Sequence, residues 1–163
     1  MRTATAKGMG TVLVVEDYDD IRGMLKVLLE SEHFRVLEAA NGPEALAVVR
    51  TERPDVVLMD IGLPGFDGFE TIRRMRKIEG FQNTPIVVLS GYSGQSTEEA
   101  ACRAGSDYFM PKPVDFDELE SLLKEILSNG DNHPKGGRPA VQRAFSNKKS
   151  VSRPTTREIR LAY

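Results

Sequence analysis

The sequence contains one cysteine, two histidines and no long hydrophobic run. Because Cys102 has no second cysteine to pair with, no disulfide can form within one chain, and a reducing, cytoplasmic environment is expected. No apolar run approaches the roughly 20 residues that a membrane-spanning helix needs. His33 and His133 have no partners at metal-ligand spacing, so both are expected at the surface. These shortages argue against a disulfide scaffold, a membrane span and a histidine-based metal site.

Charge divides the chain into segments. Residues 1–10 lack the apolar core of a secretory signal and are expected to form an N-terminal extension. Residues 1–128 hold 14 basic and 22 acidic residues, whereas residues 129–163 hold eight basic and two acidic ones. We therefore expect a compact domain over residues 11–128 and a basic, disordered tail over 129–163. The tail shows no helix-turn-helix pattern and is too short for a DNA-binding output domain, although its charge could contact nucleic acid or an acidic partner.

Short apolar runs alternate with stretches of helical periodicity through residues 11–128. The runs predict strands at 11–16, 34–38, 55–60, 85–89 and 107–110. A helix should follow each strand, the first over about 20–31. We expect Pro43 at the first position of the second helix, a capping box that begins the fourth at Ser96, and Asp115 at the start of the last. Nearly continuous apolar strands indicate that helices cover both faces, so the sequence predicts an α/β fold with a doubly wound, five-stranded parallel sheet and five helices.

Polar side chains stand at the carboxyl ends of four predicted strands. Glu16 and Asp17 follow the first strand, Asp60 ends the third, Ser90 follows the fourth and Lys112 follows the fifth. Open α/β sheets bind ligands at this edge. Carboxylate oxygens favour Mg²⁺ or Mn²⁺, and a nearby ammonium and hydroxyl suit a phosphoryl group. The sequence therefore predicts a site for a divalent cation and a phosphoryl group.

A simpler explanation remains open for part of this set. Asp17, Asp19 and Asp20 would also be favoured as caps of the first helix. Asp60 is harder to explain in that way, because it follows four apolar strand residues and precedes a loop rich in Gly and Pro. Lys112 lies between two prolines, where a cis Lys112–Pro113 bond would aim the ammonium inward.

Four motifs, in this order, resemble the receiver domain of two-component response regulators. They are Val14-Val15-Glu16-Asp17, the run from Leu58 to Gly68, Val88-Leu89-Ser90-Gly91 and Pro111-Lys112-Pro113. The resemblance covers residues 11–128 and implies the flavodoxin-like receiver fold. It also implies that Asp60 accepts a phosphoryl group from a histidine kinase or a histidine phosphotransfer protein.

The resemblance assigns a role to each site residue. Mg²⁺ would be held by Glu16, Asp17, Asp60 and the backbone carbonyl of Gly62. Lys112 and Ser90 would stabilise the phosphoryl group, and Ser90 and Phe109 would form the switch. In the family this position is usually an aromatic residue, often Tyr, whereas Phe109 has no hydroxyl to donate.

The implied function is phosphorelay signalling and not catalysis of a metabolic reaction. The expected protein is a stand-alone cytoplasmic receiver that switches its contacts with a downstream protein, and homodimerisation stays open. Two alternatives also stay open: a receiver-like interaction module that works without phosphate, and a haloacid-dehalogenase-like phosphohydrolase using Asp17-Tyr18-Asp19. The second alternative would leave Asp60 without a role.

Overall fold

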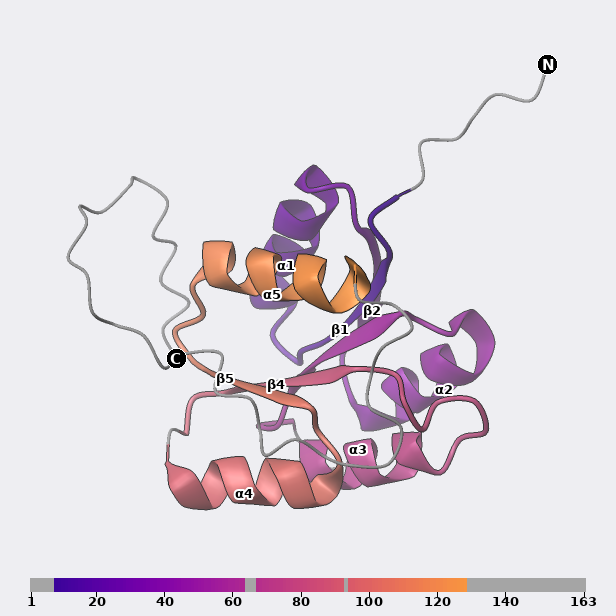
Figure 1. Cartoon of the computed structure of the whole chain (residues 1–163), viewed down its shortest axis with the longest axis vertical. Coiled ribbons are helices and arrows are strands. Elements are labelled where there is room, and N and C mark those ends of the chain that lie inside the picture. Colours follow the sequence, from indigo (N-terminus) through magenta and orange to yellow (C-terminus); the bar gives the residue numbers. More distant parts are fainter. Residues whose placement is uncertain (1–7, 64–66, 93, 129–163) are drawn as a thin grey trace.

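Five parallel strands form the central sheet of the structure, a computed structural model that describes residues 8–63, 67–92 and 94–128 (Figure 1). The strands are β1 (Thr11–Val15), β2 (Arg35–Ala39), β3 (Val56–Asp60), β4 (Ile86–Ser90) and β5 (Tyr108–Pro111). They pair in the order β2-β1-β3-β4-β5, and every pairing is parallel. Each predicted strand is confirmed, with bounds that differ by no more than one residue.

Five helices follow the strands and cover both faces of the sheet. They are α1 (Asp19–Ser31), α2 (Gly42–Glu52), α3 (Gly68–Arg76), α4 (Gln95–Ala104) and α5 (Phe116–Ser128). Helices α1 and α5 lie on one face, and α2, α3 and α4 lie on the other (Figure 1). This arrangement confirms the doubly wound α/β prediction. None of the helices in the described part of the chain is long and apolar enough to cross a bilayer.

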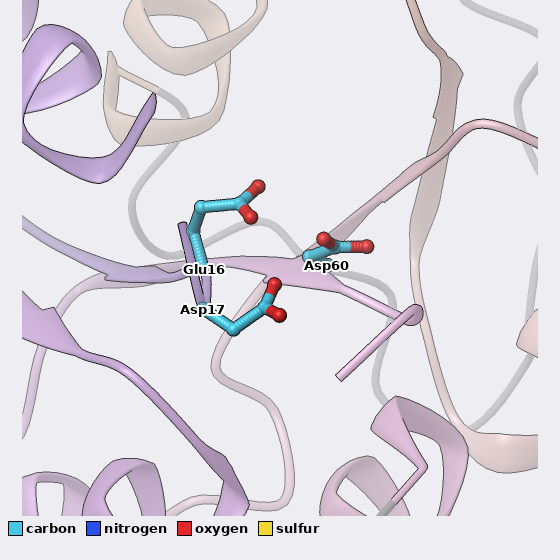
Figure 2. A group of neighbouring side chains, drawn as sticks. All are labelled: Glu16, Asp17 and Asp60. Atoms are coloured by element: carbon cyan, nitrogen blue, oxygen red, sulfur yellow. The ribbon is translucent and has the colours of Figure 1, made fainter. Parts of the chain in front are cut away.

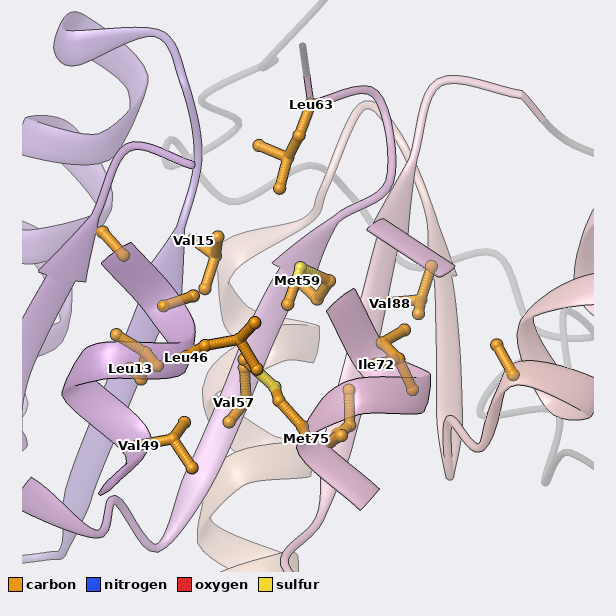
Figure 3. Close-up of a cluster of buried hydrophobic side chains, with 14 of the residues drawn as sticks. Leu13, Val15, Leu46, Val49, Val57, Met59, Leu63, Ile72, Met75 and Val88 are labelled. Carbon is orange, nitrogen blue, oxygen red and sulfur yellow. The ribbon is translucent and has the colours of Figure 1, made fainter. Parts of the chain in front are cut away.

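Alternation along the central strands divides the core between the two faces. In β1, Val12 and Val14 pack toward α1 and α5, whereas Leu13 and Val15 pack toward the opposite layer. Figure 3 shows the second cluster, in which Met59 of β3 lies among side chains from α2 and α3. Because successive strand residues point to opposite faces, burial on both faces requires the continuous apolar runs seen in the sequence.

Two helix starts differ from the predictions. Helix α4 begins at Gln95 after Gly94, so Ser96 lies inside the helix and the predicted capping box is wrong. Pro43 occupies the second position of α2, because Gly42 is already helical. The side chain of Asn41 caps α2 by accepting from the Glu44 amide at 2.9 Å. Asp115 begins α5 as predicted, accepting from the amides of the next helical residues.

The division into three segments stays a prediction, because residues 1–7 and 129–163 lie outside the described residues. The same holds for the surface position of His133. His33 is exposed, as predicted, at the turn between α1 and β2.

Arg76, the last residue of α3, holds together the loops at the amino edge of β4 and β5. Its Nε donates to the Gly105 carbonyl at 2.9 Å, and its Nη1 donates to the carbonyls of Phe81 and Thr84 at 3.2 and 2.6 Å. Its Nη2 donates to Asp107 Oδ2 at 2.7 Å, and the same oxygen accepts from the Ile86 amide. One planar guanidinium therefore connects three segments that are distant in the sequence.

Replacing Arg76 with Lys should lower the free energy of unfolding by about 2–4 kcal/mol, because the ammonium cannot reach all four acceptors and leaves carbonyls unsatisfied. Urea unfolding followed by circular dichroism measures this change. Arg103→Lys is the matched control: Arg103 is 71% exposed and, among the described residues, forms an ion pair with Glu99 alone, so it should change stability by less than about 0.5 kcal/mol. Equal losses in both variants would contradict the role of Arg76.

Candidate functional site

Three carboxylates meet at the carboxyl edge of the sheet, as the sequence predicts. Glu16 and Asp17 directly follow β1, and Asp60 is the last residue of the neighbouring strand β3. One oxygen from each of the three lies within 4.8 Å of the others, and Figure 2 shows the side chains gathered at the strand ends. Glu16 is 1% exposed and Asp60 is 7% exposed. Such close, buried acids require positive charge among them.

Lys112 supplies part of that charge from the end of β5. Its Nζ lies 3.0 Å from Glu16 Oε2 and 3.2 Å from Asp60 Oδ2, and its side chain is 10% exposed. The Lys112–Pro113 peptide bond is cis, the isomer that the sequence analysis considered. The lysine thus contacts the end of β3 and the residue after β1 at the same time, although the three residues are far apart in the sequence.

The pKa shifts show that the ammonium does not fully compensate the acids. Burial and then the charge of Asp60 raise the pKa of Glu16, and Lys112 opposes this rise without cancelling it. Burial acts to lower the pKa of Lys112, but Asp60 and Glu16 together outweigh it, so this pKa is raised. With all groups ionised, three carboxylates and one ammonium leave a formal charge of −2. A divalent cation would balance that charge.

Asp17 provides an independent sign of a cation site. Its Oδ1 is enclosed and has no hydrogen-bond partner among the described residues. Helix α1 has Tyr18 as its N-cap residue, without a side-chain cap bond, so the interpretation of Asp17 as a helix cap is wrong. Asp19 and Asp20 do lie in the first turn, where the helix dipole favours acids. An unpartnered buried carboxylate oxygen beside two further carboxylates fits a hard cation such as Mg²⁺.

Two glycines shape the loop after Asp60. The Gly62 amide donates to Asp60 Oδ1 at 2.8 Å and fixes the carboxylate, while the metal-binding role of the Gly62 carbonyl stays a prediction. A Cβ on Gly68 would lie 2.7 Å from the Asp60 carbonyl oxygen and 2.6 Å from Ile61 Cα. Only glycine permits α3 to start this close to the end of β3. Gly68 therefore positions α3 against Asp60. The sequence motif includes this glycine, but only the tertiary structure shows why glycine is required there.

The two predicted switch residues occupy different environments. Ser90, fully buried at the end of β4, has its Oγ 3.0 Å from both the amide and the carbonyl oxygen of Tyr92. The hydroxyl is thus engaged with the loop before α4. Phe109 is 5% exposed and lies in the core between the sheet and the α2–α4 layer.

Arg22 is a site residue that the sequence pattern did not reveal. Its Nη1 donates to the Glu16 carbonyl at 2.8 Å, its Nη2 lies 2.5 Å from Asp19 Oδ1, and its Nε lies 3.5 Å from Glu38 Oε1. The guanidinium therefore holds the peptide between Glu16 and Asp17 and ties it to α1 and β2. No spacing rule predicts a side-chain contact with a backbone carbonyl, so this role needed the tertiary structure.

The chain matches a known protein family in sequence. The sequence model of the response regulator receiver domain matches residues 12–124. The chain is 34% identical over 116 residues to sporulation initiation phosphotransferase F of Bacillus subtilis, covering 71% of this chain and 92% of that protein. It is 39% identical over 119 residues to the KDP operon transcriptional regulatory protein KdpE of Escherichia coli, covering 73% of this chain. The match spans 52% of KdpE, about half of its length.

A solved structure shows the same fold. The receiver domain of a sensor histidine kinase from Pseudomonas aeruginosa has a TM-score of 0.68 and 29% sequence identity, covering 73% of this chain and 98% of that one. That domain was solved with a magnesium ion coordinated in its active-site cleft.

Replacing Arg22 with Lys should weaken Mg²⁺ binding about tenfold, because the charge remains while the bond that orients the Glu16–Asp17 peptide is lost. Isothermal titration calorimetry and amide chemical shifts both measure the affinity. Lys26→Arg is the control: Lys26 pairs with the same Glu38 at 2.6 Å and, within the described part of the chain, forms no hydrogen bond or ion pair with Glu16. Equal affinities in the two variants would show that Arg22 does not position the acids.

Replacing Lys112 with Met should lower stability by about 3–5 kcal/mol without metal, because two buried carboxylates lose their counter-ion. Saturating Mg²⁺ should then stabilise this variant more than it stabilises the wild type, since the cation no longer competes with the ammonium. Urea titrations with and without Mg²⁺ test this. Lys124→Met, at a half-exposed pair with Glu120 and Glu32, should respond to Mg²⁺ like the wild type. Equal Mg²⁺ effects in all three proteins would refute the competition.

Proposed function

This chain belongs to the response regulator receiver domain family, and we propose that it accepts a phosphoryl group on Asp60 from a phosphohistidine of a histidine kinase or a histidine phosphotransfer protein. Receiver domains act in signalling as phosphoryl acceptors and not as conventional enzymes. The observation that carries the proposal is the convergence of Asp60, Lys112 and the acidic pair Glu16 and Asp17 at one sheet edge.

In the proposed reaction an Asp60 carboxylate oxygen attacks the phosphorus in line. The new bond joins that oxygen to phosphorus, the phosphorus–nitrogen bond breaks, and its electron pair returns to the imidazole of the donor. Lys112 remains close enough to Asp60 to neutralise charge on the incoming phosphoryl oxygens. The product is an acyl phosphate on Asp60.

The same acids suit a divalent cation during this transfer. Glu16, Asp17, Asp60 and the Gly62 carbonyl would hold Mg²⁺, and Mn²⁺ has the same preference for oxygen ligands. Bound Mg²⁺ would supply positive charge to the transferring phosphoryl group. Arg22 and the Tyr18 amide, which lies 3.3 Å from Glu16 Oε1, keep the acidic pair oriented.

The signal would leave the site through Ser90. A phosphoryl group on Asp60 adds negative charge at the edge where Ser90 ends the adjacent strand β4. The Ser90 hydroxyl would then donate to a phosphoryl oxygen, and its bonds to the Tyr92 backbone would be lost. The loop before α4 would move with it, and Phe109 would repack within the core beneath that helix.

The phosphohydrolase alternative fits the geometry less well. It requires Asp19 at the reacting centre, yet the Asp19 side chain is 85% exposed and binds Arg22. Asp60, which it does not use, is one of the three converging carboxylates.

Incubation with Mg²⁺ and acetyl phosphate should add one phosphoryl group, about 80 Da, to the wild type and none to Asp60→Asn. Intact-mass spectrometry measures the gain. Asp115→Asn is the control, because Asn caps the start of α5 as well as Asp does, so its gain should equal that of the wild type.

If acetyl phosphate adds no phosphoryl group to the wild type, a phosphorylated histidine phosphotransfer domain would be tested as the donor. Transfer from that domain would support the proposal with an obligatory protein donor, and no transfer from either source would favour the phosphate-independent module. Continuous phosphate release that is lost in Asp17→Asn but kept in Asp60→Asn would establish the phosphohydrolase instead.

A further inference from the structure

A groove of about 480 Å³ lies between α2 and the end of α3, in the helical layer that α2, α3 and α4 form on one face of the sheet. Pro43, Leu46 and Arg50 line it from α2, and Arg74, Lys77 and Ile78 line it from the end of α3 and the residues that follow. Leu46 is 7% exposed and Ile78 is half-buried, so they form an apolar floor. The three cationic side chains are exposed and surround that floor.

Two of these cations are exceptions to the charge pairing of the domain. Within the described residues, nine of the twelve Lys and Arg side chains form an ion pair. The other three are Arg50, Arg53 and Lys77, and the first and last of them line the groove. The same part of the chain holds 22 acidic residues, so acids are abundant. Unpaired cations therefore concentrate at this groove.

Helix dipoles explain only part of this pattern. Cations are favoured in the last turn of a helix, and Arg50 and Arg74 both lie in such turns. The dipole does not explain why the cations surround an apolar hollow. An anionic partner with an apolar surface would satisfy both features at once.

The shape of the groove favours a segment of protein over a small molecule. Its α2 residues follow the spacing i, i+3, i+7, which extends about 10 Å along the helix at 1.5 Å per residue. Four of the six lining residues are exposed, so a small ligand would leave much of its surface in water, whereas small-molecule sites usually bury most of their ligand. An amphipathic segment needs to bury only one face. The chain's own tail, residues 129–163, is basic and has the wrong charge.

We propose that the groove between α2 and the end of α3 docks an acidic, amphipathic segment of a partner protein. Apolar side chains of the segment lie on Leu46, Ile78 and Pro43, and its carboxylates pair with Arg50, Lys77 and Arg74. The contact uses none of the residues of the phosphoryl site, so it goes beyond the function proposed above and does not depend on it.

Three synthetic helical peptides test the proposal against the ¹⁵N-labelled full chain by amide chemical shifts. The first carries a leucine stripe at i, i+3, i+4, i+7 with glutamates elsewhere, the second has lysines in place of the glutamates, and the third has serines in place of the leucines. The first peptide should shift amides of α2 and of residues 74–78 and should bind at least tenfold tighter than the other two.

Variants of the groove provide a second test. Arg50→Glu combined with Lys77→Glu should weaken binding of the first peptide at least tenfold. Arg53→Glu changes an exposed cation outside the groove and should have no more than a twofold effect.

Each other outcome overturns the proposal. Absence of shifts in α2 and residues 74–78 at millimolar peptide would show that the groove does not bind the acidic peptide. Equal binding of the serine peptide would show that recognition depends on charge alone. A separate titration with ATP serves as a comparison. ATP that shifts the same amides with an affinity equal to or higher than that of the acidic peptide would indicate a nucleotide site. Repeating the titration with Asp60→Asn separates this result from phosphoryl acceptance, because the groove should bind the peptide equally well in that variant.

Discussion

The Lys112 ammonium lies 3.0 Å from Glu16 Oε2 and 3.2 Å from Asp60 Oδ2, and the carboxyl edge of the sheet is organised around this pair of contacts. The carboxylates are almost fully buried, where unpaired negative charge is costly. One ammonium reduces that cost without removing it, as the raised pKa of Glu16 indicates. With all groups ionised, the site therefore carries more negative than positive charge, which suits a divalent cation.

The remaining structure keeps these groups in place. Parallel pairing of β1, β3, β4 and β5 brings four strand ends to one edge. Arg22 fixes the peptide between Glu16 and Asp17 from α1, and Gly68 permits α3 to begin against Asp60. At the opposite edge, Arg76 connects α3 with the loops before β4 and β5. Side-chain and close backbone contacts therefore fix the helices and loops at both edges of the sheet.

The site and the groove use charge in opposite ways. At the site, acids exceed cations and the excess is buried, so the complement must be small and strongly positive. At the groove, exposed cations surround an apolar floor, so the complement is larger, acidic and partly apolar. The two are formed by different residues, so each can be tested without changing the other.

The sequence by itself determined the alternation of strands and helices, the layering of the fold and the residues at the strand ends, because apolar periodicity reports burial directly. It allowed a cis Lys112–Pro113 bond without determining it, and it misplaced the start of α4, where the capping motif at Ser96 lies one residue inside the helix. Asp17 shows the limit most clearly: its position allowed either a helix cap or a metal ligand, and only the structure left its Oδ1 without a partner. Tertiary structure alone decided the Lys112 contacts, the role of Arg22 and the groove between α2 and α3, because each joins side chains or backbone groups whose distance depends on how separate elements pack.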